Sequence, residues 1–327
     1  MRLANRLACR KISLLTEASF FYSWNLAKRD ARLVPRGEML GMTTVPIDGD
    51  KPVWILKGSF GRATVNFISR PLVAHAHSQY QFLFKLGGSN CNFRVGTDDC
   101  ALTAERALCL NPWVEHSKSS SDDEPSLILS LVIEAPWLRQ QLKLAESGTA
   151  SIFPKAEVVV TPDVRHHVDR IAAAITNHLV AHDDSCMPIL ADLVTALGRD
   201  FADPALTAGI ISSGRPIDFR IRKAVDFIKH ASVANPTVAQ VAAQVGLSRS
   251  RFFQQFRLCM GISPQHYIDW VRMSHAIQLL GASDKPLSDV AEELGFEEHS
   301  HFTRFFAQHM GVPPSEFRRH SVTLDNQ

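Results

Sequence analysis

The C-terminal third of this 327-residue chain contains one pattern twice, and this repeat strongly limits the folds open to it. Each copy has a short apolar segment ending at a glycine, a second segment with phenylalanines four residues apart, and then a Gly-x-x-Pro step. The aligned positions are Val241 and Val290, Gly246 and Gly295, Phe252 and Phe302, Phe256 and Phe306, Gly261 and Gly311, and Pro264 and Pro314. Two short helices around a glycine turn are the sequence form of a helix-turn-helix. Two copies predict a protein that binds DNA at two places.

Composition permits this interpretation and excludes some others. The chain is 45% hydrophobic and 21% charged, as in soluble proteins, and its length fits two domains. Its net charge of only +2 excludes a protein that coats polyanions without specificity, so a DNA surface must be local. The longest apolar runs are too short to cross a bilayer, and the six scattered cysteines form no C-x-x-C pair. We expect a cytoplasmic protein with reduced thiols and no membrane partner.

The first half of the chain has the pattern of a β domain. Residues 1–42 are basic and carry an aromatic patch, and we predict a loosely ordered arm there. Residues 43–162 contain short runs of branched and aromatic residues separated by turn signals, which predicts a β-sandwich or small barrel. The predicted strands are 63–69, 79–86, 92–95, 107–110, 127–134 and 157–161.

Helices follow the predicted strands. Residues 163–203 contain two segments, about 164–180 and 188–201, with apolar residues at helical spacing, which predicts a helical hairpin. The hairpin either packs on the β domain or forms a homodimer contact, and the sequence leaves both open. Residues 204–216 are rich in proline, glycine and serine and are predicted to be a linker. The repeat then lies in a helical domain of residues 217–320.

The second helix of each copy has one apolar side, which leaves the opposite side free to contact DNA. Phe252 and Phe256 in the first copy, and Phe302 and Phe306 in the second, are expected to face a core. The predicted DNA-binding residues are those on the free side, Arg249, Ser250, Phe253, Gln254, Arg257, His299, Ser300, Thr303 and Arg304. Arginine suits guanine and glutamine suits adenine, so Gln254 and Arg304 are the favoured base contacts.

A helix of about 264–280 is predicted between the two copies. Seventeen residues at 1.5 Å each give it a length of roughly 25 Å. Successive major-groove faces of DNA lie about 34 Å apart. Such a connector would set the two recognition helices on adjacent turns of one DNA face.

These residues together resemble the AraC/XylS family of transcriptional regulators. The resemblance covers both copies, the connecting helix and the closing stretch Gly311-Val-Pro-Pro-Ser-Glu-Phe-Arg318. It departs from the family pattern at Phe253, which is apolar where polar residues are common, and at His299 and His301. The resemblance implies a bacterial, sequence-specific regulator, most often an activator that recruits RNA polymerase at promoter DNA.

The β segment is similar to cupin barrels, which serve as effector-binding domains in regulators of this kind. The similarity is carried by His75-Ala-His77, Gln81, Gly87-Gly88 and the stretch from Leu110 to His116. In metal-dependent cupins, two histidines and a carboxylate from the first motif and a histidine from the second hold iron, manganese or zinc. Here Gln81 takes the place of the carboxylate, and Ala104-Glu105-Arg106 replaces the usual Pro-Gly-Asp turn.

We therefore predict that the barrel binds a small effector and holds no metal and no cofactor. The predicted effector-binding residues are His75, His77, Gln81, Trp113 and His116. Plain structural histidines and a metal held by three histidines remain alternatives for this cluster. Four basic residues of the β segment can pair with an anionic effector or stand at solvated strand edges, Arg62, Arg70, Lys85 and Arg94.

Two classes of function fit these features. The first is a transcription regulator, not an enzyme, whose effector changes how the C-terminal helices meet DNA. The alternative is a cupin-type metalloenzyme, a dioxygenase or isomerase, with a DNA-binding appendage. The amide at Gln81 disfavours the enzyme, because a facial iron site needs a carboxylate. The fold class predicted is therefore a multidomain chain, with a cupin-like β-barrel and helical hairpin followed by an all-α double helix-turn-helix domain.

Overall fold

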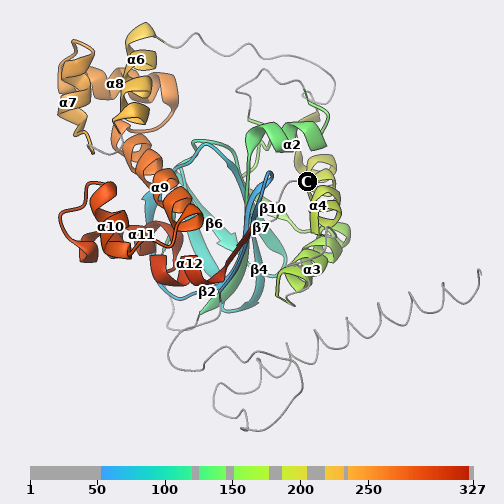
Figure 1. Ribbon diagram of the computed structural model, residues 1–327. Helices are drawn as coiled ribbons and strands as arrows, with labels where there is room; N and C mark the ends of the chain where they lie inside the picture. The colour runs from blue at the N-terminus through green and yellow to red at the C-terminus, as the bar shows by residue number, and fades with distance from the viewer. Residues whose placement is uncertain are drawn as a thin grey trace, which may run out of the picture. The chain divides into compact units, whose positions relative to one another are not determined.

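The structure is a computed structural model, and it describes residues 53–119, 125–144, 151–176, 186–204, 218–231 and 235–323. The predicted arm of residues 1–42 and almost all of the predicted linker of 204–216 lie outside these ranges. The described chain has a β-rich N-terminal part and a helical C-terminal part (Figure 1).

The β-rich part is built from two sheets. The order of the seven-stranded sheet is β10 (Glu157–Val159), β7 (Arg106–Leu110), β4 (Tyr80–Gly88), β9 (Ser126–Ile133), β2 (Gly61–Ile68), β1 (Val53–Gly58) and β11 (Ser321–Thr323). The order of the four-stranded sheet is β3 (Leu72–His75), β8 (His116–Lys118), β5 (Cys91–Val95) and β6 (Asp98–Leu102). Buried residues of both sheets, such as Leu83, Leu108 and Phe93, form one apolar core. In β5, which contains Phe93, buried and exposed residues alternate with the period of two of a half-buried strand.

All six predicted strands are present, within a few residues of their predicted ends. Strands β1, β3, β6, β8 and β11 and the helix α2 (Ala135–Gln141) were not predicted. Strand β6 begins at Asp98, directly after the turn at residues 96–97, and Asp99 pairs with Arg94 of β5 at 2.8 Å. His75 and Gln81 lie on separate strands, β3 and β4.

The predicted helical hairpin packs on the β-rich part. Helices α3 (Pro162–Thr176) and α4 (Cys186–Phe201) contact each other, and α3 contacts β1 and β2 (Figure 1). The apolar stripes of both helices are buried within this one chain, as at Val168, Ile171 and Leu193. Of the two alternatives, packing on the β domain is therefore present in the structure. A homodimer contact through residues 163–203 stays a prediction.

The C-terminal part is helical throughout. Its helices are α6 (Phe219–His230), α7 (Val238–Gln244), α8 (Arg249–Met260), α9 (Pro264–Ala282), α10 (Leu287–Glu293), α11 (His299–Met310) and α12 (Pro314–His320). Local chemistry fixes their ends. Thr237 and Gln240 form a capping box at α7, and Ser248 caps α8. Gly246 and Gly295, each at φ 69°, make the left-handed turn that joins α7 to α8 and α10 to α11.

Helix α9 joins two separate apolar cores. The first contains Phe252 and Phe256, with Tyr267 from the start of α9. The second contains Phe302 and Phe306. The four phenylalanines predicted to face a core are completely buried, so this prediction is confirmed. The two helix pairs lie at opposite ends of α9 (Figure 1). Within the described residues, no helix combines the length and apolarity that a membrane crossing requires.

Candidate functional site

Helix α8 presents the predicted DNA-contacting residues of the first copy to solvent. Arg249, Ser250, Gln254 and Arg257 are exposed, and Phe253 is 40% exposed although it is a large apolar residue. Four of these five, all except Arg257, line one shallow surface depression. The side opposite the buried Phe252 is therefore continuous and open.

Helix α11 presents the corresponding residues of the second copy. His299, Ser300 and Arg304 are exposed, and Thr303 is half-buried with its Oγ1 3.5 Å from the His299 Nε2. The Ser300 hydroxyl donates a hydrogen bond of 3.0 Å to Glu298. All nine predicted DNA-binding residues are therefore accessible, and Thr303 is the most covered.

The three arginines among the predicted DNA-binding residues carry free charges. Arg94, Arg106 and Arg199, elsewhere in the molecule, each contact a carboxylate. Within the described ranges, the guanidinium groups of Arg249, Arg257 and Arg304 form no ion pair. Unpaired, exposed guanidinium groups suit phosphate oxygens and base edges.

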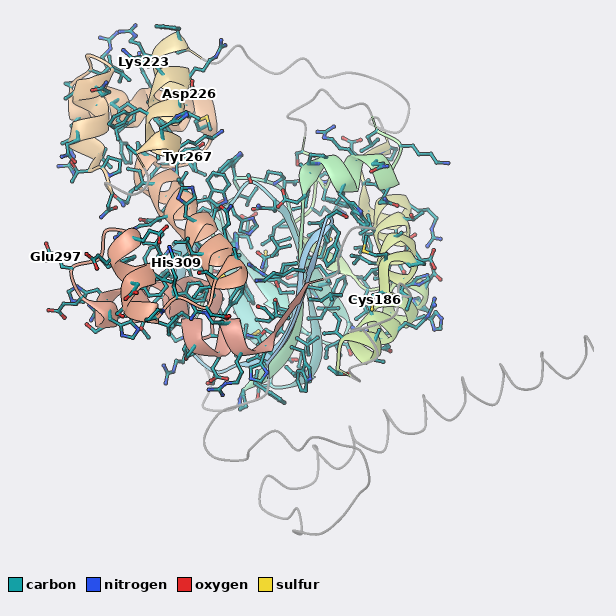
Figure 2. All side chains as sticks on the ribbon, viewed as in Figure 1. Cys186, Lys223, Asp226, Tyr267, Glu297 and His309 are labelled. Atoms are coloured by element: carbon teal, nitrogen blue, oxygen red, sulfur yellow. The ribbon has the colours of Figure 1, made fainter. Side chains whose placement is uncertain are left out.

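The two helix pairs differ sharply in charge. Residues 235–263 contain three arginines and no acidic residue, whereas residues 283–313 contain six acidic residues against one lysine and one arginine. Figure 2 shows Glu297 of the second pair projecting from the turn before α11. Electrostatic attraction to a phosphate backbone therefore comes mainly from the first pair.

Arg272 of α9 holds the turn of the second helix pair, a role that the sequence did not reveal. Its Nε donates a hydrogen bond of 2.9 Å to the Leu294 carbonyl, and its Nη2 donates one of 3.0 Å to the Gly295 carbonyl. Its guanidinium carbon lies 3.5 Å from the centre of the Phe296 ring. Burial lowers the pKa of Arg272, which shows that this charge is partly removed from water.

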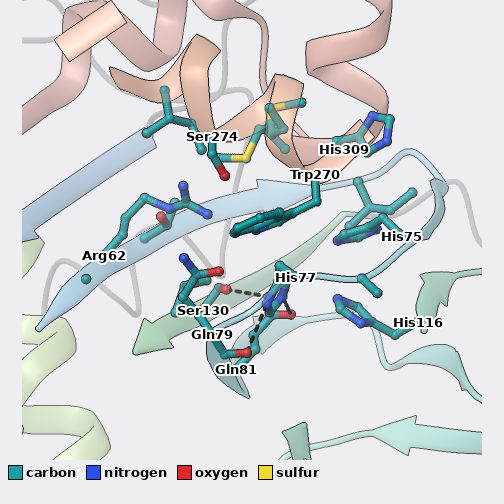
Figure 3. Close-up of a pocket in the computed structure, with 18 of the residues that line it drawn as sticks. Arg62, His75, His77, Gln79, Gln81, His116, Ser130, Trp270, Ser274 and His309 are labelled. Atoms are coloured by element: carbon teal, nitrogen blue, oxygen red, sulfur yellow. Dashed lines mark hydrogen bonds between the residues drawn. The ribbon is translucent and has the colours of Figure 1, made fainter. Parts of the chain in front are cut away.

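A cavity of about 420 Å³ lies in the β-rich part and is bounded by α9 and α11 (Figure 3). Strands β2 and β4 contribute Arg62 and Gln81, among others, while α9 contributes Trp270 and α11 contributes His309. Cavities of this size bind small organic molecules. Because α9 joins the two helix pairs, a molecule in this cavity would touch the element that spaces them.

Three predicted effector-binding histidines, His75, His77 and His116, meet in this cavity with Gln81. One ring nitrogen of each histidine lies within 4.8 Å of those of the other two. Each Nδ1 lies within hydrogen-bonding distance of a backbone carbonyl, that of Val73, Gln79 or Val114, at 2.8, 3.0 and 2.9 Å. A carbonyl only accepts, so at His75 and His116 the Nδ1 carries the proton and Nε2 is left with a lone pair.

Burial keeps these histidines neutral. It lowers the pKa of His77 to about 4 and that of His116 to about 3, and it lowers the pKa of His75 well below its usual range. At His77 both ring nitrogens face oxygen acceptors: Nδ1 faces the Gln79 carbonyl, and Nε2 lies 3.1 Å from the Gln81 Oε1, so the neutral ring donates to one of the two. The Gln81 Nε2 donates to the Ser130 hydroxyl. Neutral imidazoles are ligands that a transition metal accepts, and His75 and His116 offer free Nε2 lone pairs, so the histidine cluster fits a metal ion as well as a polar ligand.

Trp113 does not line this cavity, and its predicted place in the effector wall is corrected. Its ring lies 4.9 Å from that of Trp270 and 5.3 Å from that of Tyr267, both on α9. Its backbone has φ 64°, in the left-handed region, and its N–H donates to the His77 carbonyl at 2.8 Å. This backbone turn directs Trp113 towards the first half of α9.

The four basic residues considered for an anionic effector have different places. Lys85 donates to Asn90 at 2.9 Å, Arg94 pairs with Asp99, and Arg70 is exposed. Arg62 alone of the four lines the cavity. The sequence did not indicate Lys57, which lines the cavity beside it.

Comparison with known proteins identifies the helical part. A family model described as a helix-turn-helix domain matches residues 241–320. The lactose operon transcription activator of Staphylococcus xylosus is 35% identical over 100 residues, 31% of this chain and 36% of that protein. The arabinose operon regulatory protein of Escherichia coli K12 is 38% identical over 104 residues, 32% of this chain and 36% of that protein. The C-terminal domain is an AraC-type helix-turn-helix domain.

The similarity to those regulators covers about a third of this chain, and this chain spans about a third of the length of each. A crystal structure of apo ToxT from Vibrio cholerae has a similar fold over most of the chain, with a TM-score of 0.50 and 14% identity. That match covers 83% of this chain and 96% of ToxT, so the arrangement of a β-rich domain before the helical domain is shared.

Proposed function

We propose that this protein is a sequence-specific DNA-binding transcription regulator that responds to a small molecule bound in its β-rich domain. The observation that carries the proposal is the pair of exposed helices, α8 and α11, at the two ends of α9. The 19 residues of α9 give it a length of about 28 Å at 1.5 Å per residue. This length approaches the roughly 34 Å between successive major-groove faces.

In this proposal the helical domain of residues 217–320 is a double helix-turn-helix. Helix α8 reads one major groove through Gln254 and its neighbours, and α11 reads the next through Arg304. The two faces carry different residues, so a single copy of the protein recognises a directional, nonpalindromic site in promoter DNA. The free arginines of α8 supply most of the phosphate contacts. The chromosomal target places the protein in the bacterial cytoplasm.

The β-rich domain of residues 43–162 acts as a cupin-like effector barrel in this proposal. Its ligand occupies the cavity formed with α9 and α11, where His77 and Gln81 offer neutral polar groups. A ligand that contacts Trp270 alters the position or rigidity of α9, and with it the spacing of α8 and α11. The regulator relatives support activation, which proceeds by contact with RNA polymerase. The residues 163–203 can supply a homodimer contact through the polar sides of α3 and α4.

The alternative, a cupin-type metalloenzyme with a DNA-binding appendage, has less support. The amide of Gln81 lies beside the three histidines where an iron-dependent oxygenase needs a carboxylate. The relatives found are regulators of operons, which also favours regulation.

The proposal is tested by measuring the affinity of the full chain for the promoters beside its gene. Arg304→Ala is expected to weaken the free energy of binding to the specific DNA site by about 1–3 kcal/mol and to relax the preference at one base position. Arg170→Ala is the control, because Arg170 lies on α3 and is expected to leave DNA affinity unchanged. Equal weakening by Arg304→Ala on all sequences would assign Arg304 to phosphate contact. Binding of the wild-type chain with no sequence preference at moderate salt would refute the proposed function.

A further inference from the structure

Two cations line the effector cavity without an anionic partner. Lys57 of β1 and Arg62 of β2 are directly opposite each other in the antiparallel register. Like charges at such a position repel. In the part of the chain that the structure describes, neither side chain forms an ion pair or a hydrogen bond, and the Arg62 Nε is buried with no acceptor. The arrangement is unfavourable as long as nothing binds there.

The surroundings of Lys57 and Arg62 explain why this arrangement is unfavourable. Burial lowers the pKa of Lys57 to about 8 and that of Arg62 to about 10. In both cases desolvation of the charged group is the largest cause. Glu134 acts electrostatically on Arg62 and raises its pKa. The Glu134 carboxylate accepts a hydrogen bond of 3.0 Å from Gln79 and forms no ion pair within the described ranges. The other acidic residue of the cavity, Asp269 of α9, accepts from Gln265 at 2.9 Å. Each carboxylate therefore accepts from a glutamine amide, and among the described residues neither forms an ion pair with Arg62 or Lys57.

Apolar side chains also line this cavity. Figure 3 shows Arg62 reaching from its strand into the cavity, with Trp270 extending towards it from α9. Met273 and Ile277 of α9, and Leu83 and Phe93 of the two sheets, line the same space. A planar guanidinium beside an ammonium matches a carboxylate, which can accept two parallel hydrogen bonds from the guanidinium.

From this juxtaposition we infer that the effector is a small organic carboxylate with an apolar body. Its carboxylate lies between Arg62 and Lys57, and its body lies against Trp270, Met273 and Ile277. The inference rests on the proposed function, because it names the chemical class of the proposed effector. It also explains how binding of the ligand affects the DNA-binding domain. The Lys57 Nζ lies 4.6 Å from the ring centre of Phe317 in α12, and the Arg62 guanidinium carbon lies 5.8 Å from it.

The test measures binding to the full chain by calorimetry and thermal shift, in the presence of a chelator. The probes are octanoate and 3-phenylpropionate, each compared with its amide, octanamide or 3-phenylpropanamide, which keeps the shape and removes the charge. Both carboxylates are expected to bind saturably and to raise Tm, with affinities about tenfold or more above those of the amides. Arg62→Gln is expected to lower carboxylate affinity about tenfold or more and to leave amide affinity unchanged.

Arg70→Gln is the matched control, because Arg70 is an exposed arginine of the same domain outside the cavity, and carboxylate binding should not change. Lys57→Met supplies a second variant, and it should weaken carboxylate binding in the same direction. Equal affinities for acid and amide, unchanged octanoate binding by folded Arg62→Gln, or no binding of either acid at millimolar concentration would overturn the inference. Sequence-specific DNA binding is measured separately. If it persists while the carboxylates fail, the inference falls and the proposed regulator stands.

Discussion

Arg272 offers a direct way to test how α9 holds the second helix pair. Arg272→Met keeps an apolar stem of similar length and removes both hydrogen bonds to the turn, together with the stacking on Phe296. A hydrogen bond from a charged donor contributes about 1.5–3 kcal/mol, and a cation–π contact about 0.5–2 kcal/mol. The desolvation of this half-buried guanidinium offsets part of the sum. We expect a net loss of about 2–3 kcal/mol in the free energy of unfolding of the AraC-type domain.

The assay is urea unfolding of the full chain, followed by tryptophan fluorescence, since Trp270 lies on the same helix. Arg272→Lys keeps the charge but cannot donate in a planar fork to two carbonyls, so it is expected to lose about 1–2 kcal/mol. Arg304→Met is the control, because Arg304 is exposed and unpaired among the described residues, and the change should stay within about 0.5 kcal/mol. If Arg272→Met matched that control, or Arg272→Lys matched wild type, the reasoning would be refuted.

Two further changes test the turn and the cavity charges. Gly246→Ala should destabilise the first helix pair by about 1–2 kcal/mol, because φ is 69° and no atom lies within 4 Å of an added Cβ, so only backbone strain acts. Gly246→Asn should cost less, since asparagine tolerates this conformation, and thermal unfolding that ranks the two equally would contradict the account. Lys57→Met should stabilise the ligand-free protein by about 1 kcal/mol at neutral pH, once solvent screening of the half-buried ammonium is allowed for. The unfolded chain keeps this proton up to about pH 10.5 and the folded chain only to about pH 8, so wild-type stability rises over that window and the advantage of Lys57→Met should shrink. A stability difference that is independent of pH would show that Lys57 is not desolvated.

The helical domain was predictable because its signals are local. Phenylalanines four residues apart fix the buried side of α8 and α11, and a glycine in the left-handed turn fixes where each pair bends. These features need no knowledge of the rest of the chain. The same reasoning predicted the exposed faces, because a side chain on the side of α8 opposite the buried Phe252 must face solvent.

The cavity was predictable only in part, because its walls come from distant segments. The spacing of His75, His77 and Gln81 placed them together, and His116 joined them through its motif. Nothing near His309 or Trp270 in the sequence indicates that α9 and α11 close the same space. Strands β3 and β8 were missed because they are short, and the polar residues of β8 are nevertheless covered, as at Lys118, which is 6% exposed.

Trp113 shows the limit of motif reasoning. Its position in the second motif suggested a cavity wall, but its left-handed backbone turns the ring towards Tyr267 and Trp270. A left-handed backbone conformation is uncommon for a residue with a large side chain, and no sequence pattern indicates it at Trp113. The direction of such a side chain follows from tertiary contacts alone.

The central claim, that α8 and α11 read two different parts of one DNA site, is tested most directly by selecting binding sites from random duplexes with the full chain. The account predicts one directional sequence with two unlike elements whose centres are about one helical turn apart, roughly 10 base pairs. Arg304→Ala should relax the preference at one base position of one element and leave the other element intact. Enrichment of a palindrome with identical halves, or no enriched sequence at all, would contradict the account.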